Sequence, residues 1–293
     1  MSRERGILPE TAVIRPLLVR HYALHRGWRD VTGTRDGVWI FAHRNDGRFQ
    51  VMLPRQADAP DYPEALAIVA RRFAEAEGRA VGGVLFDLSH ADADVLSWDA
   101  RLPGDARTRT LDQQVRAWGG VRSALLCAAG AVLWPSRRHP PRTPTWLDEI
   151  ICSCQVASPG PGSGALRLIC PLAPTVTEAD PPPEVPLLRR TVCWLLTTTA
   201  TLASASQEER LESFLEADRA SPTVSAAFCE ALLHWQPCPG AEVEFSVTWA
   251  SDPAFPPPPG APEQVRLSPE CFSGIERAAA LLRSAESAAD RAA

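Results

Sequence analysis

Near the beginning of the chain, the aliphatic side chains of Val38, Ile40 and Ala42 alternate with the rings of Trp39, Phe41 and His43 along residues 38–43, and apolar side chains alternate with mostly polar ones along residues 48–53. Alternation of this kind is typical of a strand with one buried face. An Asp-Gly pair precedes the first stretch and an Asn-Asp-Gly triplet precedes the second, and these residues suit the positive φ angles of hairpin turns. With a first strand that starts at Trp28, the pattern predicts a three-stranded antiparallel meander.

A helical pattern flanks this meander on both sides. Apolar residues recur every three or four positions over residues 9–26 and 62–77, and a glycine follows each run, as is common after a helix. Pro16 falls inside the first run, and because proline is tolerated in the first turn of a helix, the helix can begin there. The pattern predicts an α-β-β-β-α module, with a further short helix at 81–88.

The rest of the chain predicts a second domain, since 293 residues are many for a single one. Residues 101–110 are polar and rich in turn formers, so we interpret them as a linker between a domain at 1–100 and a domain at 111–293. Helices are expected in the second domain at 111–134, 187–205, 208–217, 221–235 and 269–286. Strands are expected there at 146–157, 165–172, 242–250 and 264–267. The predicted fold class is α+β, an N-terminal α-β-β-β-α module followed by an antiparallel sheet backed by helices.

Charge and cysteine content narrow the classes of function. The net charge of −5 is unlike that of a typical nucleic-acid-binding domain, although it does not exclude a local basic patch. All 30 residues counted as Lys or Arg are arginine, which binds carboxylates and phosphates through two parallel hydrogen bonds and stacks on aromatic rings. The eight cysteines are spread thinly through apolar runs, which favours reduced, buried thiols. Cys152 and Cys154 lie in a predicted strand and lack a second pair at the spacing of a zinc site.

Localisation signals and catalytic motifs are absent from the sequence. No stretch reaches the 18 consecutive apolar residues of a membrane span, and the first residues lack the apolar core of a signal peptide. No phosphate-binding loop, nucleophile elbow or zinc-protease helix occurs. We therefore expect a cytoplasmic protein with no membrane partner and no cofactor, and we predict no catalytic residue.

Acidic residues and a histidine gather after the short helix predicted at 81–88. These candidate metal ligands are Asp87, His90, Asp92 and Asp94. If the helix continued, Asp87, His90 and Asp94 would share one face, and their oxygen and imidazole ligands would suit Mg²⁺ or Mn²⁺. The alternative is a solvated helix end, where aspartate and serine are common.

Two further groups are candidate partner-binding residues. One is the face of the middle strand that carries Trp39, Phe41 and His43, together with Arg48 on the next strand. Interface centres favour tryptophan and arginine, but large aromatic residues also fill cores. The other is a proline-rich basic loop that carries Arg137, Arg138, His139 and Arg142. Its arginines lie near two tryptophans and could contact phosphates or bases, or could simply be solvated.

The α-β-β-β-α order resembles double-stranded-RNA-binding-like folds, among them the small mRNA-interferase toxins of the HicA type. That toxin family carries a catalytic histidine in a Gly-Ser-His segment of its middle strand. The matching segment here is Asp36-Gly37-Val38-Trp39, so the resemblance implies the topology without the catalytic histidine.

A second resemblance rests on Leu53-Pro54-Arg55, the Asp-Tyr-Pro-Glu-Ala-Leu segment at 61–66, the Ala-Glu-Gly-Arg segment at 76–79, Asp87-Leu88 and Ala93-Asp94-Val95. These segments are similar to the N-terminal part of a family of uncharacterised bacterial proteins from GC-rich genomes, often encoded near phage-defence genes. The resemblance implies a component of a bacterial antiviral defence system and brings no catalytic residues.

The leading hypothesis is therefore a non-enzymatic recognition or scaffold subunit. Its partner would be a protein encoded nearby, or a nucleic acid, held by the meander face and the arginine-rich loops. One alternative is a metal-dependent nuclease or nucleic-acid-binding effector that uses the Asp/His group. Another is an antitoxin- or immunity-like protein, for which an acidic charge is suitable. The sequence does not predict the oligomeric state.

Overall fold

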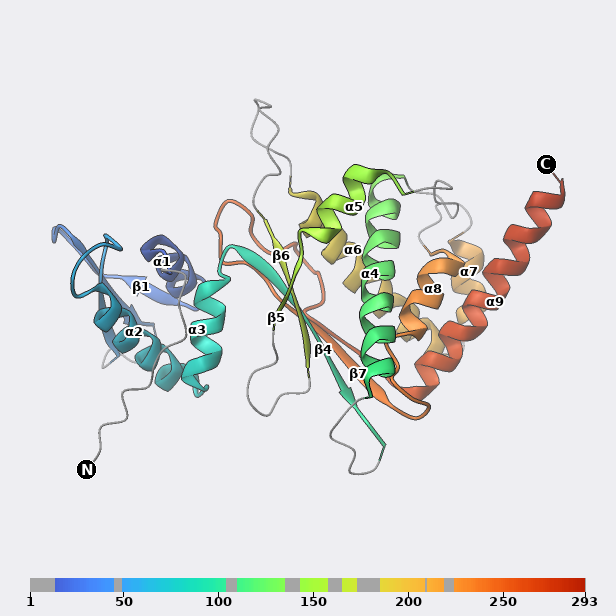
Figure 1. Cartoon of the computed structure of the whole chain (residues 1–293), viewed down its shortest axis with the longest axis horizontal. Helices are drawn as coiled ribbons and strands as arrows, with labels where there is room; N and C mark the ends of the chain where they lie inside the picture. The colour runs from blue at the N-terminus through green and yellow to red at the C-terminus, as the bar shows by residue number, and fades with distance from the viewer. Residues whose placement is uncertain are drawn as a thin grey trace. The chain divides into compact units, whose positions relative to one another are not determined.

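The computed structural model describes residues 14–44, 49–103, 110–134, 143–157, 165–172, 185–208, 210–218 and 224–292. The fold is α+β, as the sequence predicts, with one three-stranded and one five-stranded sheet in these residues (Figure 1). The chain divides into two compact units. Unit 1 comprises Met1–Ala93 and Trp249–Pro256, and unit 2 comprises Asp94–Thr248 and Pro257–Ala293.

Unit 1 contains the predicted α-β-β-β-α order followed by one more helix. Its elements are α1 (Pro16–His25), β1 (Trp28–Asp30), β2 (Val38–His43), β3 (Gln50–Pro54), α2 (Tyr62–Glu77) and α3 (Val81–Ser89). The strands form an antiparallel meander in the order β1-β2-β3. Pro16 is the first residue of α1, and Gly78 ends α2 in the left-handed conformation with φ 64°, so both boundary signals of the sequence are confirmed.

The register of the meander decides which face is buried. Phe41 lies opposite Val51, and Trp39 lies opposite Leu53, so these four side chains share one face. Phe41 and Leu53 are fully buried in a core shared with α1 and α2. The helices therefore cover the aromatic face of β2.

Unit 2 is built on the five-stranded sheet, in the order β5-β6-β4-β7-β8. Its strands are β4 (Ala93–Arg101), β5 (Gln155–Ala157), β6 (Leu166–Pro171), β7 (Glu242–Thr248) and β8 (Gln264–Leu267). Its helices are α4 (Leu111–Leu133), α5 (Thr145–Cys152), α6 (Leu187–Gln207), α7 (Leu211–Ala217), α8 (Ala226–Leu233) and α9 (Pro269–Ala292). Figure 1 shows the helices gathered on one side of this sheet.

The central strand β4 was missed by the sequence analysis, which allowed the helix after residue 81 to continue. The helix α3 ends at Ser89, and β4 pairs with β7 in an antiparallel register that places Trp98 opposite Phe245. Val95 and Leu96 are both buried, so the strand is covered on both faces. A strand of this kind has no apolar-polar alternation and is easily taken for another element.

A second correction concerns residues 146–157, predicted as one strand. The chain instead forms the helix α5, and only Gln155–Ala157 is a strand. Leu147 and Ile151 are four residues apart, and both are buried on one side of α5. Cys152 is therefore at the end of a helix, not in a strand beside Cys154. A short apolar run does not by itself distinguish the two structures.

Candidate functional site

The predicted metal ligands are distributed over three different local structures. Asp87 is in α3, His90 follows its last residue, and Asp92 is in the turn before β4. Asp94 is inside β4. No group of three or more His, Cys, Asp or Glu side chains suited to a metal ion occurs among the described residues. The shared helical face that motivated the hypothesis does not exist, because α3 ends before His90.

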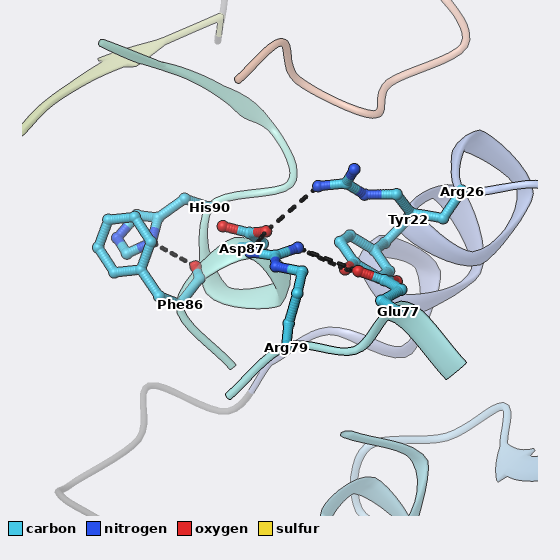
Figure 2. A network of polar contacts seen from close by, with 7 residues as sticks. All are labelled: Tyr22, Arg26, Glu77, Arg79, Phe86, Asp87 and His90. Carbon is cyan, nitrogen blue, oxygen red and sulfur yellow. Dashed lines mark hydrogen bonds and ion pairs between the residues drawn. The ribbon is translucent and has the colours of Figure 1, made fainter. Parts of the chain in front are cut away.

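Asp87 belongs instead to a network of polar side chains in unit 1, shown in Figure 2. Nη2 of Arg79 donates to Oδ2 of Asp87 at 2.7 Å, and Nη2 of Arg26 reaches the same oxygen at 3.4 Å. Nη1 of Arg79 also donates to Glu77 at 3.0 Å, and the Tyr22 hydroxyl donates to both oxygens of Glu77 at 2.9 Å. The network ties α1, the end of α2 and α3 together.

Burial and charge shift the proton affinities in this network. Burial, assisted by the neighbouring Glu77 carboxylate, raises the pKa of Tyr22 well above its usual value. Burial alone would lower the pKa of Arg79, but the hydrogen bond and charge of Asp87 outweigh it and raise that pKa. The network therefore holds two carboxylates against fixed positive charge, which is a structural arrangement and not that of a poised acid or base.

His90 and Asp92 are also engaged. Nδ1–H of His90 donates to the Phe86 carbonyl oxygen at 2.7 Å, and the two rings pack with centroids 4.4 Å apart (Figure 2). Asp92 accepts from Nη2 of Arg15 at 2.7 Å in an exposed ion pair. Each residue is thus held by a partner other than the remaining candidates.

Asp94 forms a fully buried polar contact in unit 2. Nε and Nη2 of Arg189, on α6, donate to its two carboxylate oxygens at 2.7 and 2.8 Å. Both side chains are fully buried. The planar guanidinium matches the carboxylate in a two-point contact that lysine could not make. Asp94 therefore fixes β4 to α6.

The predicted contact face on the meander is mostly inside unit 1, which corrects the expectation that it is exposed. Phe41 is fully buried, and His43 packs edge-on against Trp28 with ring centroids 5.2 Å apart. Trp39 is half-buried, with the guanidinium carbons of Arg20 and Arg55 5.8 and 5.6 Å from its ring centroid. Because both faces of β2 are apolar, its alternation does not reveal which face is buried.

The outward face of the meander carries exposed aliphatic side chains beside the polar Arg29 and Gln50. The Val31 N–H donates to the Ile40 carbonyl at 2.8 Å, and Ile40 lies opposite Met52. Val31 is 44% exposed and Met52 is 57% exposed. The remaining partner-binding candidates, Arg48, Arg137, Arg138, His139 and Arg142, lie outside the described residues.

A pocket that the sequence analysis did not find lies in unit 2, between α4, α5 and α8. Its volume is about 390 Å³. Leu126 and Leu147 provide apolar walls from α4 and α5, and Ala227 and Ala231 provide the wall from α8. Small residues, including Gly130 on α4, leave space that larger side chains would fill. No motif marks such a pocket in the sequence, because it depends on how three helices pack.

Helix packing beside this pocket depends on Gly120. A Cβ atom at this position would lie 2.6 Å from the His234 Cβ and 2.7 Å from the Ala231 carbonyl oxygen. Only a glycine therefore allows α4 and α8 to approach this closely. The close contact sets the spacing of the two helices where the pocket begins.

The polar groups in the pocket are few. They are Ser123, Cys127, Thr143, Glu230 and His234. Burial, together with the charge of Glu230, raises the pKa of Cys127 to about 11, so its thiol stays protonated at neutral pH. Glu230 itself is paired with Arg283 of α9. This chemistry is suited to holding an apolar group with a few polar contacts, and not to nucleophilic attack.

Two tryptophans lie at the edge of the pocket. Trp134, which lines it, is 38% exposed, and Trp146 is 45% exposed. Their ring centroids are 6.3 Å apart with an interplanar angle of 61°, an edge-to-face arrangement. Exposed tryptophans beside a concave apolar surface are typical of binding sites.

Comparisons of the chain with protein families, with curated proteins and with solved structures found no match. Among the described residues, none of the helices has both the length and the apolar content needed to cross a membrane.

Proposed function

We propose that this chain is a non-enzymatic recognition or scaffold subunit, and that the pocket between α4, α5 and α8 receives an apolar side chain of a protein partner. The observation that carries the proposal is the pocket with Trp134 and Trp146 at its edge. Its volume of about 390 Å³ is within the range of ligand pockets. Aromatic residues around such a pocket supply much of the binding energy of protein interfaces.

The charge of the pocket favours a protein over a nucleic acid. Among the described residues that line it, Glu230 is acidic and none is arginine. Nucleic-acid binding depends on arginine or lysine contacts to phosphates, and the described lining residues offer none. The partner proposed here is a protein encoded nearby, in keeping with the resemblance to bacterial proteins found beside phage-defence genes.

The raised pKa of Cys127 supports a binding role over a catalytic one. A thiol with a pKa near 11 is a poor nucleophile at neutral pH, because almost none of it is thiolate. No observation among the described residues favours the metal-dependent nuclease or the antitoxin-like protein, and both stay predictions.

The test is to fill the pocket without disturbing the core. Ala227 lines the pocket and has an exposed side chain. The larger side chain of Ala227→Trp should therefore fill the pocket and exclude the partner. Ala288→Trp on the exposed surface of α9 is the matched control. The products of the adjacent genes are co-expressed with each variant, purified, and titrated by calorimetry.

We expect one gene product to bind the wild-type chain and Ala288→Trp with the same affinity. Its affinity for Ala227→Trp should be lower by about tenfold or more, since the anchor of an interface carries at least about 1.4 kcal/mol. Equal affinity of the wild-type chain and both variants would show that the partner does not bind in the pocket. Binding of a small apolar compound but of no gene product would replace the protein partner with a ligand.

A further inference from the structure

Two cysteines of unit 2 lie next to each other on adjacent strands. The sulfur atoms of Cys154 and Cys170 are 3.7 Å apart. Cys154 immediately precedes β5, and the antiparallel pairing of Gln155 with Ile169 places it directly opposite Cys170 in the ladder. Both residues are free thiols.

This position is compatible with a disulfide bond. Residues directly opposite in an antiparallel pair have Cα atoms about 4.5–5.5 Å apart, and disulfides span about 4.4–6.8 Å between Cα atoms. An S–S bond is about 2.05 Å long, so the two sulfurs need to approach by roughly 1.7 Å. Rotation about χ1 of the two side chains can supply a movement of this size without a change in register.

The surroundings of the two thiols differ. Cys154 is partly exposed, and its hydrogen-bond contact with Cys170 lowers its pKa. Cys170 is fully buried; its contact with Cys154, its burial and the nearby charge of Asp94 raise its pKa. An oxidant from solvent therefore reaches Cys154 first, which is the thiol that ionises more readily. The protonated thiol of Cys170 lies beside it.

We propose that Cys154 and Cys170 form a redox site, in which a peroxide converts the two thiols into a reversible disulfide. The Cys154 thiolate attacks one oxygen of hydrogen peroxide, the O–O bond breaks, and the products are a sulfenic acid and hydroxide. The sulfur of Cys170 then attacks the sulfenic acid sulfur, and the hydroxyl group leaves as water with the Cys170 proton. The two thiols lose two electrons in total, and the peroxide is reduced to two molecules of water.

The bond would change a defined part of unit 2. The Cys154 N–H donates to the Ile151 carbonyl of α5 at 3.2 Å. A disulfide to Cys170 would therefore link the end of α5 covalently to β6. The inference is independent of the proposed partner binding, because it depends only on the geometry of the strand pair.

The experiment treats the folded wild-type chain with hydrogen peroxide, blocks the remaining thiols with an alkylating agent, and maps the cysteines by mass spectrometry. We expect a peptide pair joined through Cys154 and Cys170, lost again on treatment with dithiothreitol. Cys152→Ser, which removes the exposed neighbouring thiol, should give the same pair. Cys170→Ser should instead accumulate the sulfenic acid at Cys154, detected as a dimedone adduct.

The wild-type result decides the proposal even if a variant fails to fold. Alkylation of both Cys154 and Cys170 after peroxide treatment of the folded chain would overturn it. A disulfide between Cys154 and Cys152 in place of Cys170 would also overturn it, because the strand register would then not direct the chemistry. Absence of a dimedone adduct in folded Cys170→Ser would show that Cys154 is not the residue that peroxide oxidises first.

Discussion

Arginine side chains bind the carboxylates that the sequence offered as metal ligands. Each acidic candidate ligand, Asp87, Asp92 and Asp94, is bound by an arginine of another segment. The pairs differ in burial, from the exposed Arg15–Asp92 pair to the fully buried Arg189–Asp94 pair. Because solvent screens exposed pairs, only the buried one is expected to matter greatly for stability.

Removing one partner of the buried pair tests this difference. Asp94→Ala leaves the Arg189 guanidinium buried without its counter-charge and should lower the free energy of unfolding by about 3–5 kcal/mol. Asp92→Ala, the matched exposed case, should cost at most about 1 kcal/mol. Urea denaturation followed by circular dichroism measures both. A loss at Asp94 no larger than that at Asp92 would contradict the buried two-point contact.

The two tyrosines of the chain provide a second test at the residue scale. Tyr22 and Tyr62 are both buried in unit 1, and burial raises the pKa of Tyr62 from 10 to about 12. At pH 11 a tyrosine with its ordinary pKa is about nine-tenths ionised, whereas one with a pKa of 12 is about one-tenth ionised. Ultraviolet titration of the native chain should therefore show little tyrosinate at pH 11, and the urea-unfolded chain should show nearly all of it.

The raised pKa of Tyr62 also makes the folded state less stable at high pH. Because the folded pKa of Tyr62 lies above the unfolded value, its contribution is fully present below pH 10 and is lost as the pH rises from 10 through 12. Tyr22, whose pKa is also raised, acts in the same direction. Tyr22→Phe isolates the titration of Tyr62. Equal titration curves for the native and unfolded chains would contradict the burial of the hydroxyl groups.

At the scale of elements, the contact between α4 and α8 depends on the absence of one methyl group. Gly120→Ala places a Cβ 2.6 Å from the His234 Cβ and should destabilise unit 2 by about 1–3 kcal/mol, because the two helices must separate. Gly119→Ala is the matched control: nothing lies within 4 Å of its Cβ position, and alanine should stabilise the helix by about 1 kcal/mol. The unfolding temperature should fall for Gly120→Ala and rise for Gly119→Ala, as measured by thermal unfolding.

Elements were predictable where local signals agree and unpredictable where tertiary packing decides. The helix Tyr62–Glu77 has clear periodicity and a glycine at its end, and the structure confirms it together with the antiparallel pairing of the meander. Thr110 caps α4 through a reciprocal contact with Gln113, so this helix start was also readable. The strand β4 was not, because burial on both faces removes alternation.

The candidate site was less predictable than the fold. Its pocket is made of apolar and small side chains on three helices separated by up to about a hundred residues, and no spacing rule connects Leu126 with Ala231. The Cys154–Cys170 contact was missed for a related reason, since Cys154 was assigned to the same strand as Cys152. Only the correct hairpin register brings the two sulfurs together.

At the scale of the whole molecule, neither unit is a continuous piece of chain. Unit 1 ends at Ala93 and resumes with Trp249–Pro256, and unit 2 resumes after that segment. The returning segment is integrated into unit 1, since the Ser251 N–H donates to the Ala91 carbonyl at 2.7 Å and Ala250 is 1% exposed.

This interleaving constrains the order of events on the ribosome. The first 93 residues emerge long before the segment that completes their unit, with residues 94–248 still to be translated. At about 5–20 residues per second, that interval is on the order of 10–30 s. During it the nascent unit 1 lacks the segment whose Ser251 later bonds to Ala91, and the incomplete unit can be bound by chaperones or proteases.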